Sequence, residues 1–128
     1  WQDLLGDLSD RVEIRPRTRD PREAYGDADL VLSPSRIESF NRVIAEGLAN
    51  GLPFIASDIP AHAELMTTTR AGQLFPLDDP ESAGRLLDSL VQEPEAFLAL
   101  CRASEESSER FDAHAIAHRL ARDWQERL

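Results

Sequence analysis

The sequence predicts an α/β fold in which helices cover a parallel β-sheet. Short β-forming runs alternate along the chain with segments of helical periodicity, which is the pattern of consecutive βαβ units. Two of these runs, Leu30–Leu32 and Phe54–Ala56, are continuously apolar, as expected for strands that are buried on both faces. With 128 residues and an apolar fraction of 41%, the chain is large enough for one domain with a core of its own.

The expected elements follow from the apolar spacing and from helix caps. The strands are Val12–Arg15, Leu30–Ser33, Pro53–Ser57 and Gly72–Phe75. The helices are Pro21–Gly26, Phe40–Asn50, Ala61–Met66, Pro80–Gln92, Pro94–Glu109 and Asp112–Leu128, preceded by a helical segment with Trp1, Leu4, Leu5 and Leu8. Asp79 followed by Pro80 is a favoured helix start, and Asn50-Gly51 is a favoured helix end. Because the first residue already lies in a helical pattern, we expect the chain to be a piece of a longer protein.

Composition excludes several functional classes. The chain has 24 acidic and 14 basic residues, a net charge of −10, which argues against binding to nucleic acid or to an anionic membrane surface. No apolar run approaches the ~18 residues of a membrane span. Cys101 is the only cysteine, so a disulfide framework is excluded and a reducing compartment, the cytoplasm, is expected.

The segment Phe40–Asn50 carries its apolar residues on one helical face, which is expected to pack on the sheet. Ser39 is the predicted N-cap of this helix. The amides from about Phe40 to Val43 would then lack intrahelical partners at the carboxyl edge of the sheet, where parallel α/β sheets bind ligands. Free amides at the positive end of a helix favour an anion such as a phosphate.

Two carboxylates flank this helix start. Glu38 precedes it and Glu46 lies about two turns inside the helix. Carboxylate oxygens accept hydrogen bonds from the hydroxyls of a sugar or a ribose, so the segment is a candidate site for a phosphorylated sugar. The alternative is structural, because Arg42 and Glu46 have the spacing of a surface ion pair and Glu38 can be a solvated loop acid.

Three stretches carry a resemblance to a known family. They are Asp27–Ser35 (DADLVLSPS), Glu38–Glu46 (ESFNRVIAE) and Gly47–Asp58 (GLANGLPFIASD). In this order they resemble the C-terminal domain of group 1 retaining glycosyltransferases of the GT-B fold, whose pattern reads loosely A-D-hydrophobics-P-S, E-G-F-G-x-x-x-x-E and A-x-G-x-P-V-x-A-S. The resemblance implies a Rossmann-like parallel sheet with flanking helices. It also implies a nucleoside diphosphate sugar as donor substrate, with no metal and no other cofactor.

The resemblance further implies a role for each residue of the motif. Glu38 is the catalytic residue that contacts the donor sugar, and Glu46 contacts the ribose. The other donor-binding positions are Ser39, Phe40 and Asn41, which form the turn, and Arg42 and Val43, which offer amides to the phosphates, while Arg17 or Thr18 contacts the nucleobase. Ser39 and Asn41 replace the two glycines of the family's turn, and Asn is among the residues that best tolerate positive φ.

Parts of the family's architecture have no counterpart in the sequence. The first two strands of the family's sheet and the N-terminal acceptor domain are missing, so we predict that residues 1–128 are a partial nucleotide-sugar-binding domain and that Val12–Arg15 does not pair in the family's usual order. The parent protein is predicted to transfer a sugar to an acceptor hydroxyl with retention. A non-catalytic binding or interaction module and a GT-B-type sugar-nucleotide epimerase remain as alternatives. The lone His62 receives no catalytic role.

Overall fold

The structure, a computed structural model, describes residues 6–16, 18 and 20–125. Its centre is a parallel sheet with the strand order β1 (Val31–Ser33), β2 (Phe54–Ser57) and β3 (Gly72–Phe75). Val31 lies in register with Phe54, and Phe54 with Gly72. Each strand begins within one residue of a predicted start and ends at the predicted residue, so the α/β class and the parallel sheet are confirmed.

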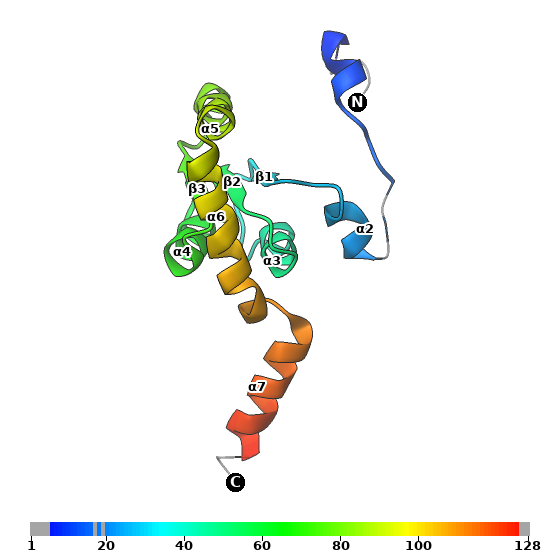
Figure 1. Cartoon of the computed structure of the whole chain (residues 1–128), viewed down its shortest axis with the longest axis vertical. Helices are drawn as coiled ribbons and strands as arrows, with labels where there is room; N and C mark the ends of the chain where they lie inside the picture. Colours follow the sequence, from blue (N-terminus) through cyan, green and yellow to red (C-terminus); the bar gives the residue numbers. More distant parts are fainter. Residues whose placement is uncertain (1–5, 17, 19, 126–128) are drawn as a thin grey trace.

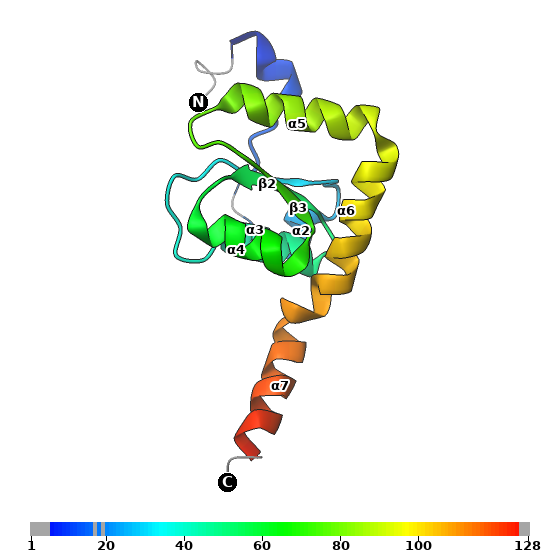
Figure 2. The same cartoon turned by 90° about the vertical axis from the view of Figure 1, so that its left-hand side faces the viewer.

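Helices cover both faces of this sheet. They are α2 (Pro21–Tyr25), α3 (Arg42–Ala49), α4 (Pro60–Thr69), α5 (Pro80–Gln92), α6 (Pro94–Ser107) and α7 (Ala113–Gln125), with short 3₁₀ helices at Gly6–Arg11 and Ser108–Arg110. Helices α3 and α4 lie on one face and α5 on the other, while α6 packs against all of them (Figures 1 and 2). Helix α7 extends away from the sheet (Figure 1). Of the predicted N-terminal helical segment, residues 1–5 lie outside the described residues.

Local signals set the limits of α5, whereas packing sets those of α4. Helix α5 has the predicted bounds because Pro80 opens it and the Asp79 carboxylate accepts a hydrogen bond from the Ser82 amide at 2.9 Å. Helix α4 continues three residues beyond the predicted Met66 and ends at Thr69, with Arg70 as its C-cap at a φ of 57°. Thr69 is buried at the end of this helix and its hydroxyl donates to the Leu65 carbonyl at 2.8 Å, so these contacts hold the last turn despite the low helix propensity of its β-branched threonines.

The prediction of a strand at Val12–Arg15 is wrong. This segment is drawn out in Figure 1 but pairs with none of the strands in the described part of the chain, and Val12 and Ile14 are exposed. Its charged residues pair locally, because the Arg15 guanidinium forms an ion pair with Glu13 at 3.0 Å. A short alternating run forms a strand only when a sheet edge is close enough to pair with it. As expected, the segment does not join the sheet in the family's usual order.

The core divides into two layers, one on each face of the sheet. Phe54 and Ala56 of β2 face α3 and α4, and Ile55 faces α5, as the two-residue period of a strand requires. The first layer contains Val31, Ile44, Leu48, Phe54, Ala56, Leu65 and Ala71, and the second contains Ile55, Phe75, Ala83 and Leu90. Burial of Ile44 and Leu48 fixes α3 against β1 and places its N-terminus at the carboxyl edge of the sheet.

Gly72 is required by the close approach of a phenyl ring. A methyl group added at Gly72 would lie 2.5 Å from two ring atoms of Phe54, which is fully buried. We expect Gly72→Ala to lower the free energy of unfolding by about 1–3 kcal/mol, because neither the rigid ring nor the strand can move away without strain. Denaturant unfolding measures this loss. Gly84→Ala, at a helical glycine with open space around it, is the control and should leave the stability equal or higher.

Candidate functional site

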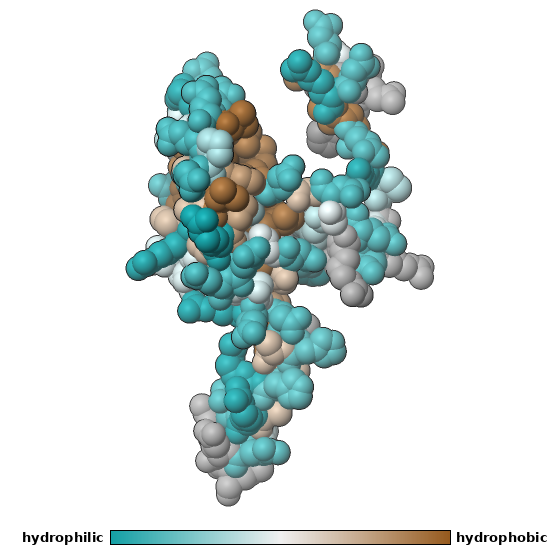
Figure 3. Space-filling model, in the orientation of Figure 1, coloured by the Kyte–Doolittle hydropathy of each residue, from teal (hydrophilic) through white to brown (hydrophobic). Residues whose placement is uncertain are grey.

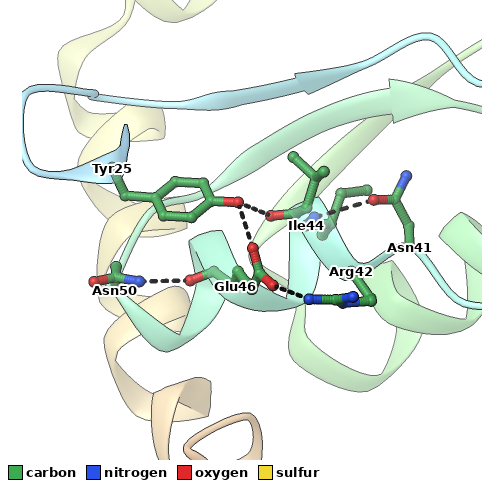
Figure 4. A network of polar contacts seen from close by, with 7 residues as sticks. Tyr25, Asn41, Arg42, Ile44, Glu46 and Asn50 are labelled. Carbon is green, nitrogen blue, oxygen red and sulfur yellow. Dashed lines mark hydrogen bonds and ion pairs between the residues drawn. The ribbon is translucent and has the colours of Figure 1, made fainter. Parts of the chain in front are cut away.

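The N-terminus of α3 is capped by Asn41, not by Ser39 as the sequence predicted. The Asn41 side-chain oxygen accepts a hydrogen bond from the Ile44 amide at 3.1 Å, and its backbone is extended with φ −84° and ψ 97° (Figure 4). The helix therefore begins at Arg42, two residues later than expected. Asn41 replaces Ser39 as the cap because its side chain is buried beneath the helix, whereas Ser39 is exposed.

Two amides of the first turn of α3 are available to a ligand. The Ile44 and Ala45 amides donate to the side chain and the carbonyl of Asn41. The amides of Arg42 and Val43 have no hydrogen-bond partner within the described part of the chain. An anion at this end of the helix would accept from both donors without breaking a bond of the protein.

Glu46 is held by two partners from different elements. Its Oε1 atom pairs with Nη2 of Arg42 at 3.0 Å, and its Oε2 atom accepts from the hydroxyl of Tyr25 in α2 at 3.1 Å. Figure 4 shows Tyr25 and Arg42 reaching the carboxylate from different sides. The Glu46 side chain is 32% exposed, so it is accessible and yet restrained. The predicted i,i+4 ion pair is thus present, while the contact with Tyr25 was missed, since nothing in the sequence shows that α2 lies beside α3.

Glu46 lines a surface cavity of about 550 Å³. The cavity lies between α3 and the segment that enters α7, and its lining includes Phe40, Arg42, Glu46, Phe111, Asp112 and His114. Phe40 is 53% exposed and offers an aromatic surface to this space. An aromatic ring, a guanidinium and a carboxylate together suit a ligand that has both a flat ring and hydroxyl groups.

Glu38 has different surroundings. Its Oε1 atom accepts a hydrogen bond from the Ser35 hydroxyl at 2.9 Å, and the Ser35 carbonyl accepts one from the Ser57 hydroxyl at the end of β2. Neither Glu38 nor Ser39 lines the cavity that contains Glu46. The structure thus brings Phe40, Arg42 and Glu46 together, and it holds Glu38 at the carboxyl edge of the sheet, apart from that cavity.

A second cavity of about 490 Å³ opens at the other side of this edge, against α5. Its lining is largely apolar and includes Leu32, Phe75, Ala83 and Leu87. Figure 3 shows hydrophobic residues gathered in the same part of the molecule, whereas α7 and the N-terminal arm are mostly hydrophilic. An ion pair between Arg36 and Asp78, with nitrogen–oxygen distances of 2.7 and 2.9 Å, borders this cavity.

The predicted nucleobase loop is only partly described. Arg17 lies outside the described residues. The Thr18 hydroxyl is bonded within its own segment, to the Asp20 backbone at 3.2 Å and to the Glu23 carboxylate. Thr18 therefore supports the start of α2, while the neighbouring Asp20 lines the cavity of Glu46. A nucleobase contact by Arg17 or Thr18 stays a prediction.

The pKa of Tyr25 is raised from 10.0 to about 12, first because the phenol is partly desolvated and second because it donates a hydrogen bond to the Glu46 carboxylate. Since the neutral phenol is favoured in the folded state, its contribution to stability is complete below the ordinary pKa and is lost as the pH rises toward about 12. Tyr25 is the only tyrosine of the chain, so tyrosinate absorbance reports on it alone.

We expect a titration midpoint near 12 in the folded chain and near 10.0 in the denatured chain. Glu46→Gln should move the folded midpoint down, because it removes the negative charge beside the phenolate. An equal midpoint in both variants would show that Tyr25 and Glu46 are not in contact. Absorbance titration in the near ultraviolet measures all of these values.

The sequence profile described as "Glycosyl transferases group 1" matches residues 1–93, most of the chain. The chain belongs to the group 1 glycosyltransferases. A D-inositol 3-phosphate glycosyltransferase from Thermobispora bispora is 32% identical, with 98% of this chain and 31% of the relative covered. A GDP-mannose-dependent α-mannosyltransferase from Mycobacterium tuberculosis is 36% identical over 64% of this chain and 22% of the relative.

The fold of this glycosyltransferase domain also has a solved counterpart. Sucrose-phosphate synthase from Thermosynechococcus elongatus superposes with a TM-score of 0.81 at 24% identity, covering 98% of this chain and 33% of that structure. This likeness supports the GT-B-like fold. The chain spans between 22% and 33% of the length of these three proteins. Within the described ranges, no helix combines the length and the hydropathy that crossing a membrane requires.

The structure of this glycosyltransferase domain adds two features of the candidate site that sequence reasoning missed. Tyr25 restrains Glu46, and His62, fully buried in α4, contacts the side chain of Asn41 at 2.9 Å. The only sequence signal for His62 was its place in the first turn of the helix after β2, close to the carboxyl edge of the sheet. That signal does not distinguish a partner of Asn41 from an ordinary core residue.

Proposed function

We propose that this chain is the donor-binding part of a retaining glycosyltransferase, which transfers a sugar from a nucleoside diphosphate sugar to an acceptor hydroxyl. The observation that carries the proposal is the pair of free amides at Arg42 and Val43, one helical turn from a half-buried carboxylate that lines a cavity. A diphosphate and a ribose diol are adjacent in such a donor, and these groups suit them in turn. One relative is named for its use of GDP-mannose, a donor of this class.

The diphosphate would accept hydrogen bonds from the amides of Arg42 and Val43. The positive end of the α3 dipole and the exposed guanidinium of Arg42 add to the attraction. As the bond between the sugar and the phosphate breaks, negative charge grows on the departing diphosphate. Amide groups that are already oriented toward the diphosphate stabilise its charge in the transition state more than its charge in the bound substrate. This difference lowers the activation barrier.

Glu46 would bind the ribose hydroxyls, with Phe40 beside the nucleoside. Each carboxylate oxygen has two lone pairs, so the contacts with Arg42 and Tyr25 leave Glu46 able to accept from a diol. Glu38 is proposed to be the catalytic residue that orients the donor sugar, together with the turn Ser39 to Asn41. Attack by the acceptor on the same face, assisted by the leaving phosphate, requires no separate protein base and no metal or other cofactor.

The acceptor is proposed to bind to a domain that the rest of the parent protein contributes, at a cytoplasmic location. Residues 1–128 would then be the partial domain that holds the donor. The first two strands of the family's sheet, and with them further phosphate-binding residues, would come from outside the chain.

A non-catalytic nucleotide-sugar-binding module is the second candidate. It is favoured by the position of Glu38, which is bonded to Ser35 and does not line the cavity of Glu46. It is also favoured by Asn41, because its side chain already accepts the hydrogen bond of the Ile44 amide, which is then not available to a ligand. In this case the protein would bind the donor and leave it intact.

The test is calorimetric titration of the full-length protein with uridine, guanosine and adenosine diphosphate sugars, followed by an assay for release of the nucleoside diphosphate. Binding of one class together with release supports the enzyme. Binding without release, with a range of acceptors present, supports the module. If no nucleotide sugar binds, both candidates are rejected.

A further inference from the structure

We infer that His62 is a positioning residue for the donor site. It would act through Asn41 by holding the N-terminus of α3 in the orientation that a diphosphate requires. The expected effect of His62 on donor binding rests on the proposed function. The contacts that His62 makes are present whether or not that function is correct. His62 is fully buried in the first turn of α4 and does not line the cavity of Glu46.

The ring of His62 has one defined protonation pattern. Its Nδ1 atom lies 2.8 Å from the backbone carbonyl oxygen of Ser57, at the end of β2. A carbonyl oxygen only accepts, so Nδ1 carries the hydrogen and donates it. The Ser57 hydroxyl, 3.4 Å from Nδ1, is a weaker contact and is directed at the Ser35 carbonyl. In the neutral ring, Nε2 is then an acceptor.

Asn41 supplies the matching donor. Its side-chain oxygen accepts from the Ile44 amide, which fixes which end of the carboxamide faces His62. The Nδ2 atom therefore points at the ring and lies 2.9 Å from Nε2 and 2.7 Å from the Ser33 hydroxyl. Its two hydrogens satisfy both acceptors. Asn41 is 3% exposed, so water cannot replace these partners at low cost.

The cap of α3 and the protonation pattern of His62 consequently depend on each other. If Nε2 carried a hydrogen, two donors would face each other at 2.9 Å, and the Asn41 carboxamide would have to turn over. The turned group would present its nitrogen to the Ile44 amide and the cap would be lost. The His62 ring, which belongs to α4, thus connects the start of α3 with the end of β2.

The contact between His62 and Asn41 lies directly beside the backbone amides that are proposed to bind the diphosphate. Arg42 and Val43 follow Asn41 in the chain, so loss of the Asn41 cap would loosen the first turn of α3 and change the directions of both amides. Hydrogen bonds weaken steeply with poor angles, and a displacement of about 1 Å in a site is enough to reduce its activity strongly. Where the family's motif has a glycine, this chain has Asn41, and the buried His62 is one of its side-chain partners.

Two matched substitutions separate positioning from general stability. In His62→Gln, the side-chain carbonyl can reach the place of Nε2 and accept from Asn41, while the donor to Ser57 is lost. In His62→Asn, the side-chain amide can take the place of Nδ1 and donate to Ser57, while the acceptor for Asn41 is lost. Each variant leaves one buried group unpaired, so we expect similar losses of stability.

Donor affinity of the full-length protein should distinguish the two variants. We expect His62→Asn to weaken binding of the nucleotide sugar by about tenfold or more, and His62→Gln by less than about threefold. Calorimetric titration measures both, and denaturant unfolding checks that the stabilities match. Equal losses of affinity in the two variants would overturn the inference.

A spectroscopic readout tests the same inference without a donor. Nitrogen chemical shifts of the His62 ring should report hydrogen on Nδ1, and the Ile44 amide should shift in His62→Asn but not in His62→Gln. Hydrogen on Nε2, or an Ile44 amide that does not distinguish the variants, would contradict the inference. If the wild type binds no nucleotide sugar, the proposed function fails while these shifts still decide the role of His62.

Discussion

Replacing Glu46 with glutamine is expected to weaken nucleotide-sugar binding by about 10- to 100-fold in the full-length protein. A hydrogen bond from a ribose hydroxyl to a charged acceptor is stronger than one to a neutral amide, and glutamine also presents an N–H group where a lone pair was. The fold should change little, because the Glu46 side chain is partly exposed and its ion pair with Arg42 lies at the surface. Titration with the donor identified in the panel measures the dissociation constant.

Glu106→Gln is the matched control. Glu106 is an exposed glutamate on α6 and lines neither cavity described above. Glu106→Gln removes the same charge from the acidic surface as Glu46→Gln does. Comparing the two variants therefore separates the loss of a local contact with the ligand from a general change in the charge of the protein. A dissociation constant that is equal in Glu46→Gln and the wild type would remove Glu46 from the donor site and with it the main support for the proposed function.

Replacing Phe54 with alanine is expected to reduce the free energy of unfolding by about 3–5 kcal/mol. Phe54 is fully buried in the central strand, and its ring lies under Gly72 of the neighbouring strand. Removing the ring leaves a cavity in the layer between the sheet and α3. This loss is a large part of the total for a domain, which is typically about 5–15 kcal/mol. Denaturant unfolding monitored by circular dichroism measures it.

Phe54→Leu is the control, since it keeps most of the apolar volume and should cost less than the alanine variant. If the ring fills the space above Gly72, the penalty of Gly72→Ala should also shrink in the Phe54→Leu background, because the two residues share a contact. Independent effects of the two substitutions would contradict this packing.

The sequence predicted best where a signal is local. Strand β3 and helix α5 have the predicted bounds because turn residues, a proline and a capping aspartate act over a few positions. The burial of β2 on both faces also followed from its continuous apolar run. The family motif placed Phe40, Arg42 and Glu46 together, and these residues line one cavity.

Prediction failed where the outcome depends on distant partners. Val12–Arg15 has the residues of a strand but does not join the sheet that the described residues form. Ser39 and Asn41 are both good capping residues, and the choice between them is made by the buried contact of Asn41 with Ser33 and His62. Tyr25 and Glu46 are far apart in the sequence and meet only because α2 lies against α3.

The sequence by itself determined the α/β class, the parallel order expected of its βαβ units and the family to which the chain belongs. These properties follow from periodicity, turn chemistry and a motif, all of which are read over short stretches of chain. Only the tertiary structure decided where α3 begins, which amides stay free, how Glu46 is held and that Glu38 has separate surroundings. Those outcomes depend on which buried polar groups find partners, and partners from different elements are brought together only by the packed fold.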